Sequence, residues 1–121
     1  MPGIQETLPV LITNWMKHFG EHTLEEGLIR IAQVTSQNIA RIFGFPQKGS
    51  LTVGKDADIA VVDTNSPWTV KKEDLFTKKQ WSAYEGMKLL GRPVATFLRG
   101  KLVYQEGKIV GEPQGERIVR C

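Results

Sequence analysis

Apolar residues near the start of the chain recur at spacings of three and four, which is the period of an amphipathic α-helix. The stripe ends at Gly20, and Pro9 fits a helix only in its first turn. We therefore expect a helix that begins around residues 5–8 and ends at Gly20. Its apolar positions are Ile4, Leu8, Leu11, Ile12, Trp15, Met16 and Phe19.

A second helical stripe begins after Thr23. The segment Thr23–Glu26 (TLEE) is typical of a capping box, in which the threonine side chain accepts from the N–H of Glu26 and the glutamate reaches back. The polar residues 36–38 could interrupt this helix, and Asn38 would then restart it as an N-cap. Gly44 closes the segment, because Pro46 blocks its continuation. The helical positions are Leu24, Leu28, Ile31, Thr35, Ile39 and Ile42.

After Pro46 the pattern changes to that of short β-strands. Leu51 and Val53 alternate with polar neighbours, and the apolar run 59–62 is typical of a strand buried on both faces. A hairpin is expected at Arg99–Lys101, and the region 71–92 is expected to be a loop with one helical turn. Further short strands are predicted at 68–70, 94–98, 102–104 and 108–110.

The predicted fold class is therefore α+β. Two or three helices in residues 1–46 precede a short-stranded sheet in residues 47–121. The run 59–62 needs cover on both faces, and the chain has little left to supply it. We expect the covering elements to be missing or to come from another copy.

Length and cysteine content narrow the class of protein. A chain of 121 residues suits one modest domain and is too short for a complete α/β barrel, which needs roughly 250 residues. One cysteine, Cys121, excludes an intramolecular disulfide framework and a cysteine-based zinc site. At a chain end it is also a poor candidate for an organised nucleophile.

Charge and hydropathy indicate no nucleic-acid or membrane partner. The net charge of +3 is not gathered into a basic stripe, because Glu73 and Asp74 separate the pairs Lys71-Lys72 and Lys78-Lys79. The sequence has no apolar run of about 18 residues and no basic-then-apolar segment at its start. We expect a cytoplasmic protein.

The two histidines lie in the segment His18–His22, which fits the zinc-protease pattern H-x-x-E-H with Glu21 as base. That chemistry needs both histidines on one face of a continuous helix. Gly20 stands between them where the apolar stripe stops, so a helix–helix connection with two solvated histidines is favoured. A small zinc protease built on His18, Glu21 and His22 is the alternative.

Asp56, Asp58 and Asp63 flank the apolar run 59–62. Such a D-x-D spacing can bind Mg²⁺ or Ca²⁺, but no further ligands follow at loop spacing. We favour a turn at residues 54–58, in which the side chains of Asp56 and Asp58 accept from nearby backbone N–H groups. Nucleophile elbows and phosphate-binding glycine loops are also absent from the sequence, so it assembles no active site by itself.

Six segments, taken in order, resemble the C-terminal part of the cyclic amidohydrolases, the family of dihydroorotase, allantoinase and dihydropyrimidinase (hydantoinase). The resemblance covers nearly the whole chain, and dihydroorotase-like members are the most similar. One departure is Ile39, which stands where the family usually has proline. The segments are Pro2–Pro9 (PGIQETLP), Thr35–Gly44 (TSQNIARIFG), Gly49–Ile59 (GSLTVGKDADI), Trp81–Met87 (WSAYEGM), Gly91–Val94 (GRPV) and Arg99–Tyr104 (RGKLVY).

The resemblance implies a metal-dependent α/β barrel that hydrolyses a cyclic amide. Two zinc ions, bridged by a carboxylated lysine and held by histidines and an aspartate, are implied for the full-length parent. The motifs that carry those ligands precede the matched segments, and neither His18 nor His22 falls on a ligand position. No catalytic, substrate-binding or metal-binding residue is therefore expected in this chain.

By this resemblance, residues 1–46 correspond to the last barrel helices and residues 47–121 to the C-terminal part of an incomplete β-sandwich. The parent is expected to hydrolyse dihydroorotate, with an allantoinase or hydantoinase parent as the alternative, and the chain alone is expected to be inactive. A non-catalytic association module is a further alternative. The expected partner is a second copy or the missing N-terminal part of the parent.

Overall fold

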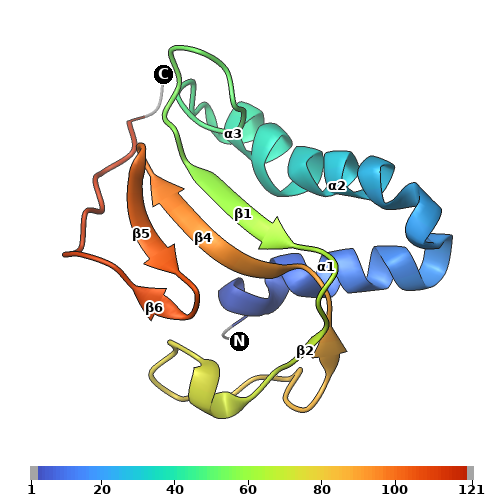
Figure 1. The fold of residues 1–121 in the computed structure, drawn as a ribbon. Helices are drawn as coiled ribbons and strands as arrows, with labels where there is room; N and C mark the ends of the chain where they lie inside the picture. Colours follow the sequence, from blue (N-terminus) through green and yellow to red (C-terminus); the bar gives the residue numbers. More distant parts are fainter. Residues whose placement is uncertain (1–2, 120–121) are drawn as a thin grey trace. The chain divides into compact units, whose positions relative to one another are not determined.

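The computed structural model describes residues 3–119, which form an α+β fold as the sequence predicts (Figure 1). The helical part comes first and consists of α1 (Ile4–Phe19), the 3₁₀ turn η1 (Glu21–Thr23), α2 (Leu24–Ala32), the π-helical turn η2 (Gln33–Gln37) and α3 (Asn38–Phe43). The later part holds β1 (Ile59–Asp63), β2 (Trp68–Thr69), the 3₁₀ turn η3 (Lys72–Asp74), β3 (Lys88–Leu89), β4 (Arg92–Leu98), β5 (Lys101–Gln105) and β6 (Lys108–Ile109).

The chain divides into two compact units that cut across this order. The first combines the segment up to Leu28 with Val62–Pro93, and the second combines Ile29–Val61 with the segment from Val94 onward. One sheet has the strand order β1-β4-β5-β6, and a second, two-stranded sheet pairs β2 with β3. The assignment of residues 1–46 to a barrel and of 47–121 to a sandwich stays a prediction.

The first unit has its core between α1 and the two-stranded sheet. Val70, Leu75 and Leu89 form a buried cluster, against which Val10 of α1 packs. Thr13 Oγ1 accepts a 2.8 Å hydrogen bond from the N–H of Leu90, which ties the helix to the chain after β3. The buried face of α1 only partly matches the apolar stripe predicted from spacing, because Ile12 is its one fully buried member while Ile4 and Phe19 are 97% and 56% exposed.

Helix α1 begins at Ile4, whereas the presence of Pro9 had led us to expect a start within residues 5–8. Thr7 closes the first turn by donating to Gly3 O from both its N–H and its hydroxyl, at 2.9 and 2.6 Å. Pro9 is the sixth helical residue, past the first turn, and is fully buried. Burial of its ring in the core offsets the hydrogen bond that a proline cannot donate.

The connection between α1 and α2 differs in detail from the predicted capping box. Gly20 ends α1 with a φ of 87°. The hydroxyl of Thr23, expected to cap toward Glu26, instead accepts from Trp15 Nε1 at 3.0 Å and donates to Gly20 O at 2.9 Å. The indole ring of Trp15 also packs closely on Gly27, since a Cβ at Gly27 would lie only 2.5 Å from Cδ1 and Nε1 of Trp15. Contact with Trp15 therefore decides how the second helix starts.

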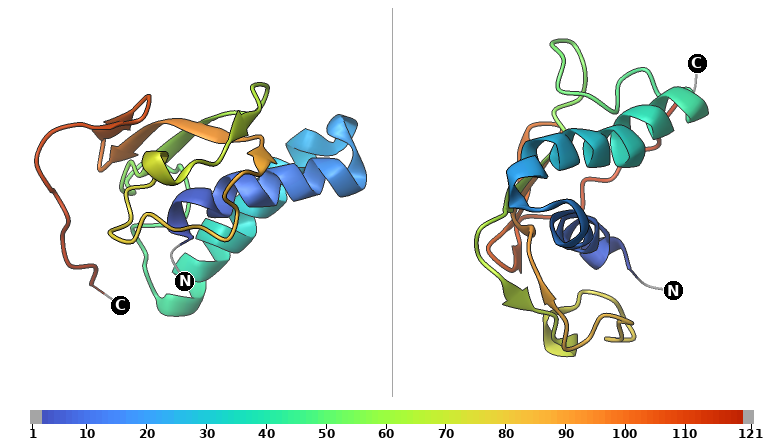
Figure 2. Two further views of the ribbon diagram at one scale, coloured as in Figure 1. Left: turned by 90° about the horizontal axis from the view of Figure 1, so that it is seen from below. Right: turned by 90° about the vertical axis from the view of Figure 1, so that its right-hand side faces the viewer.

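Residues 29–43 of the second unit form one continuous helical rod (Figure 2). The irregularity predicted at 36–38 is present as the π turn η2, but the prediction that Asn38 is an N-cap is wrong, because its φ of −67° and ψ of −37° are helical. A π turn absorbs an irregularity without breaking the helix. Ile39 supports this continuity, since it retains the N–H that a proline would lack.

The end of α3 is the one predicted at Gly44, which has left-handed dihedral angles of 68° and 49°. The N–H of Phe45 donates to Ala40 O at 2.8 Å, and that of Gly44 donates to Arg41 O at 3.4 Å. This is the hydrogen-bond pattern of a Schellman motif, which favours glycine at this position.

Two strand predictions are wrong in part. Residues 51–53 form no strand, and Leu51 is 75% exposed, because no neighbouring strand within residues 3–119 pairs with them. The run 59–62 does form β1, but its residues are half-buried or exposed rather than buried on both faces. Strand β3 lies in the region predicted to be loop, while η3 supplies the predicted helical turn.

The predicted hairpin joins β4 to β5 through Arg99 and Gly100, whose φ angles are 47° and 79°. A second hairpin joins β5 to β6 through Glu106 and Gly107, with φ angles of 44° and 87°. Two positive φ angles in a two-residue loop match the twist of antiparallel strands. In the described part of the chain, no helix is both long and apolar enough to cross a membrane.

Candidate functional site

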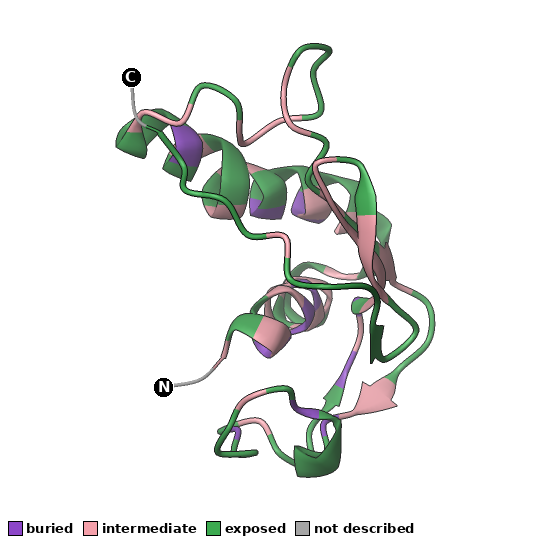
Figure 3. Cartoon of the chain, turned by 90° about the vertical axis from the view of Figure 1, so that its left-hand side faces the viewer, coloured by how far each residue is buried: buried purple, intermediate pink, exposed green. Residues whose placement is uncertain are grey.

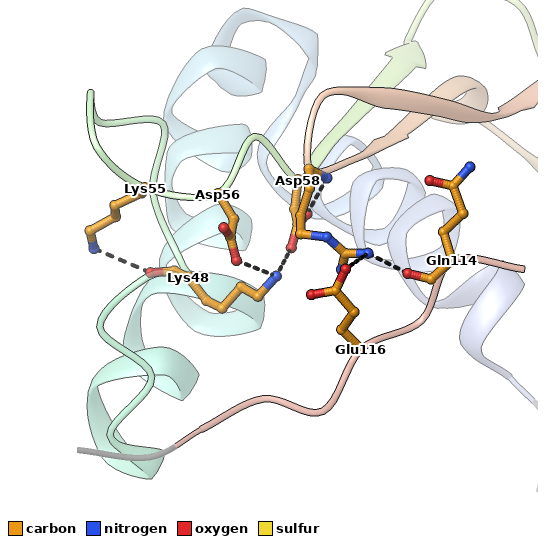
Figure 4. A network of polar contacts seen from close by, with 7 residues as sticks. Lys48, Lys55, Asp56, Asp58, Gln114 and Glu116 are labelled. Carbon is orange, nitrogen blue, oxygen red and sulfur yellow. Dashed lines mark hydrogen bonds and ion pairs between the residues drawn. The ribbon is translucent and has the colours of Figure 1, made fainter.

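A group of paired charges in the second unit surrounds Lys48, in the loop that leads from α3 to β1. The Lys48 ammonium lies 2.8 Å from Asp56 Oδ2 and 2.5 Å from Asp58 Oδ2 (Figure 4). The backbone brings these residues together, because the N–H of Asp56 donates to Gln47 O at 3.0 Å. One lysine therefore neutralises both aspartates of the D-x-D segment.

The network continues to the hairpin between β4 and β5. Asp58 Oδ1 accepts a 2.8 Å hydrogen bond from the backbone N–H of Arg99, and Gly100 N–H donates to Ala57 O at 2.9 Å. The Arg99 guanidinium then pairs with Glu116 at 3.0 Å and donates to Gln114 O. The segment that leads to the C-terminus is mostly exposed (Figure 3), and within residues 110–119 Gln114 alone is half-buried. The network joins a loop, a hairpin and the C-terminal segment.

The charges in this network shift the titration of two members. Hydrogen bonds to Asp56 and then to Asp58 raise the pKa of Lys48 above its ordinary value. Burial raises the pKa of Asp58, but the hydrogen bonds from Lys48 and from the Arg99 N–H outweigh burial and hold the pKa below its ordinary value. Both groups are therefore stabilised in their charged forms at neutral pH.

A cavity of about 370 Å³ lies beside Lys48, between the end of α3 and the loop. Arg41, Lys48 and Lys55 line it with mostly apolar neighbours. Lys55 donates to Lys48 O at 3.2 Å, so two of the three cationic residues also belong to the network. Because Lys48 is already paired, the arrangement suits holding the loop in place better than proton transfer.

Asp63 caps a turn that the sequence reasoning did not assign to it, since its Oδ1 accepts from the N–H groups of Asn65 and Ser66 at 2.8 and 3.2 Å. The prediction that Asp56 and Asp58 accept from the backbone of their own turn is wrong, because Lys48 and the distant N–H of Arg99 are their partners. The Lys48 ammonium lies between these two carboxylates, where a bound Mg²⁺ or Ca²⁺ would be expected.

The histidines of the H-x-x-E-H segment lie in different elements. His18 belongs to the last turn of α1, His22 belongs to η1, and Gly20 breaks the helix between them, as predicted. Across residues 3–119, no three His, Cys, Asp or Glu side chains form a group that could hold a metal ion. Cys121 lies outside the described residues.

Sequence reasoning missed Lys48 and Arg99 as members of the network. Lys48 could have been noticed, because it lies eight residues before the D-x-D segment. Arg99 could not, because it lies 41 residues after Asp58. It also missed Glu6, which is 1% exposed on α1 and whose Oε2 has no partner among the described residues. Long-range contacts of this kind leave no local pattern.

Comparison with known proteins adds a consistent set of similarities. A model described as the amidohydrolase family matches residues 10–103. The dihydroorotase of Pyrococcus furiosus is 35% identical over 123 residues, covering 99% of this chain and 27% of that protein. The allantoinase of Desulfitobacterium hafniense (strain Y51) is 40% identical over 114 residues, covering 94% of this chain and 24% of that protein.

A solved structure gives the same picture. L-hydantoinase (dihydropyrimidinase) from Arthrobacter aurescens superposes with a TM-score of 0.79 at 31% identity, over 91% of this chain and 24% of that one. The chain thus spans about a quarter of the length of the curated relatives and of the solved structure that it matches.

Proposed function

Because the chain belongs to the amidohydrolase family, we propose that it is the C-terminal portion of a cyclic amidohydrolase. The observation that carries the proposal is the match of nearly the whole chain to about a quarter of each relative, including a dihydroorotase, an allantoinase and a D-hydantoinase. On this proposal, α1 to α3 are the last barrel helices and the four-stranded sheet is part of a β-sandwich.

We propose dihydroorotate as the substrate of the parent enzyme, which would act in pyrimidine metabolism in the cytoplasm. Support comes from the dihydroorotases of three Pyrococcus species, each aligned over 99% of this chain at 35–37% identity. Allantoin or a hydantoin is the alternative substrate. Its support is a set of allantoinases at 39–40% identity and a D-hydantoinase at 32% identity.

The chain by itself is proposed to be inactive. Two zinc ions and a carboxylated lysine would belong to other residues of the parent, since this chain has two histidines in all and they lie in separate helical elements. Lys48, the most strongly paired lysine of the site, is occupied by two aspartates.

A hydrolysis assay tests this proposal. The purified chain, supplied with zinc, is expected to open the ring of dihydroorotate, allantoin or hydantoin no faster than buffer does. The dihydroorotase of Pyrococcus furiosus, assayed in parallel, is the positive control. Turnover by the chain that is lost in both His18→Ala and His22→Ala would contradict the proposal and favour the zinc-protease-like arrangement of those histidines.

A second candidate function is non-catalytic association. It is supported by large apolar side chains that the described fold leaves exposed, an unusual feature for a monomer when they are numerous. The partner would be the remainder of an amidohydrolase domain or a second copy of this chain. The exposed residues include Ile4, Ile42, Leu51, Val53 and Ile109.

A further inference from the structure

After β6, residues 110–119 follow an irregular course that belongs to no helix or strand. In the described part of the chain, the last backbone hydrogen bond that ties them to the sheet runs from Val110 N–H to Val103 O, at 2.9 Å. Beyond it, Arg99 Nη2 lies 3.0 Å from Glu116 Oε1 and also donates to Gln114 O. Among residues 3–119, this one guanidinium supplies the hydrogen bond and the ion pair that tie residues 111–119, which we call the strap, to the sheet.

The backbone of Arg99 is unusual for a residue with a long side chain. Its φ of 47° is left-handed, at the first position of the two-residue loop between β4 and β5, where glycine, asparagine and aspartate are preferred. A conformation that a Cβ disfavours persists where the surroundings fix it. Here the N–H of Arg99 donates to Asp58 Oδ1 at 2.8 Å, and that of Gly100 donates to Ala57 O at 2.9 Å. Residues 57 and 58 therefore fix the direction in which the Arg99 side chain leaves the loop.

The charges around Asp58 leave the Arg99 guanidinium to the strap. Asp58 Oδ2 lies 2.5 Å from the Lys48 ammonium, so this carboxylate has a cation of its own. Figure 4 shows Lys48 on one side of Asp58, with Gln114 and Glu116 on the other. Arg99 contacts Asp58 through its backbone N–H and contacts the strap through its side chain. One residue thus links the aspartate to the strap.

We propose that Arg99 is a clasp that holds the strap and that Asp58 sets this clasp, so that loss of the Asp58–Arg99 bond releases the strap. Without that bond, the left-handed loop loses one of the two hydrogen bonds from residues 57 and 58, and the guanidinium is no longer aimed at Glu116. Such coupling is reciprocal, so the docked strap also stabilises the Asp58–Arg99 bond. All these residues lie in the second compact unit, and the coupling does not depend on the reaction of the parent enzyme.

The motion of Gly115, which lies in the strap, tests the proposal. In Asp58→Ala and in Arg99→Met, the heteronuclear NOE of the Gly115 amide should fall toward that of a mobile chain, because a released strap moves on the nanosecond timescale. Asp56→Ala is the matched control. It also removes one carboxylate from Lys48, but it leaves the Arg99 N–H bonded to Asp58, so the NOE of Gly115 should stay as in the unaltered chain.

Trypsin gives a second readout, because it cleaves after Arg117 once the strap has come free. The rate of this cleavage follows the population of the released form. It should be several-fold higher in Arg99→Met than in the unaltered chain. Lys101→Met, which removes an exposed cation from the first position of β5, should leave it unchanged.

If Asp58→Ala does not fold, the reciprocal measurement decides whether the two are coupled. Arg99→Met keeps the N–H that Asp58 accepts but loses the strap, so the protection of the residue 99 amide against hydrogen exchange should fall several-fold. An unchanged NOE of Gly115 in Arg99→Met would overturn the clasp. Equal release by Asp56→Ala and Asp58→Ala, or unchanged protection at residue 99, would overturn the role of Asp58. Hydrolysis enters none of these measurements.

Discussion

Gly91→Ala is expected to lower the free energy of unfolding by about 2–5 kcal/mol, the sum of an overpacking cost of about 1–3 and a backbone cost of about 1–2 kcal/mol. Gly91 has a φ of 75°, and a Cβ there would lie 2.6 Å from Cδ1 and 3.1 Å from Cβ of Ile12. Ile12 is fully buried in α1, so its side chain has no free space to enter. Urea unfolding followed by circular dichroism measures the loss.

Gly86→Ala is the matched control for this substitution. Gly86 has a similar φ of 81°, but nothing lies within 4 Å of its Cβ position. It should therefore lose only the backbone term of about 1–2 kcal/mol. Adding Ile12→Val, which removes Cδ1, should recover part of the Gly91→Ala loss in a double-mutant cycle. Equal losses for Gly86→Ala and Gly91→Ala would show that the close approach to Ile12 does not matter.

Lys48→Met is expected to cost about 1–2 kcal/mol of unfolding free energy at pH 7. The substitution leaves Asp56 and Asp58 facing each other without their shared counter-ion, and all three side chains are a fifth to a third exposed. Removing one partner of a fully buried pair costs roughly 3–5 kcal/mol, and partial exposure reduces that cost. Lys101→Met, at an exposed position on β5, is the control and should change stability by less than about 0.5 kcal/mol.

The cost of Lys48→Met should depend on pH with a definite sign. The pKa of Asp58 is lowered in the folded state, so the stability it brings is present above its ordinary value of 3.8 and is lost as the pH falls through the lowered value. The difference between the unaltered chain and Lys48→Met should therefore shrink on acidification below about pH 4. Urea unfolding at pH 7 and at pH 3 measures this, and a difference that grows in acid would contradict the assigned pairing.

The sequence predicted those features that depend on neighbours a few residues apart. The apolar period of α1, the left-handed glycine that ends α3 and the hairpin at Arg99 and Gly100 are local in this sense. The alternation at Leu51 and Val53 led to a wrong strand prediction, because an alternating segment forms a strand only when another strand lies beside it. Its prediction needed tertiary information that the local pattern does not contain.

The candidate site was predictable only as far as its residues are close in sequence. The D-x-D segment stood out, but the local turn predicted for its aspartates is not what they cap. The partners of Asp56 and Asp58 come from Lys48 and from the hairpin 41 residues further on, and only the fold brings them together. The break at Gly20 was local, and it correctly separated the two histidines into different helical elements.

Zinc content is the most direct test of the central claim that the metal centre of the parent enzyme lies outside these residues. Elemental analysis of the chain, purified without chelators, should find far less than one zinc ion per chain. One or more zinc ions per chain, with a loss of zinc in His18→Ala or His22→Ala, would contradict the account.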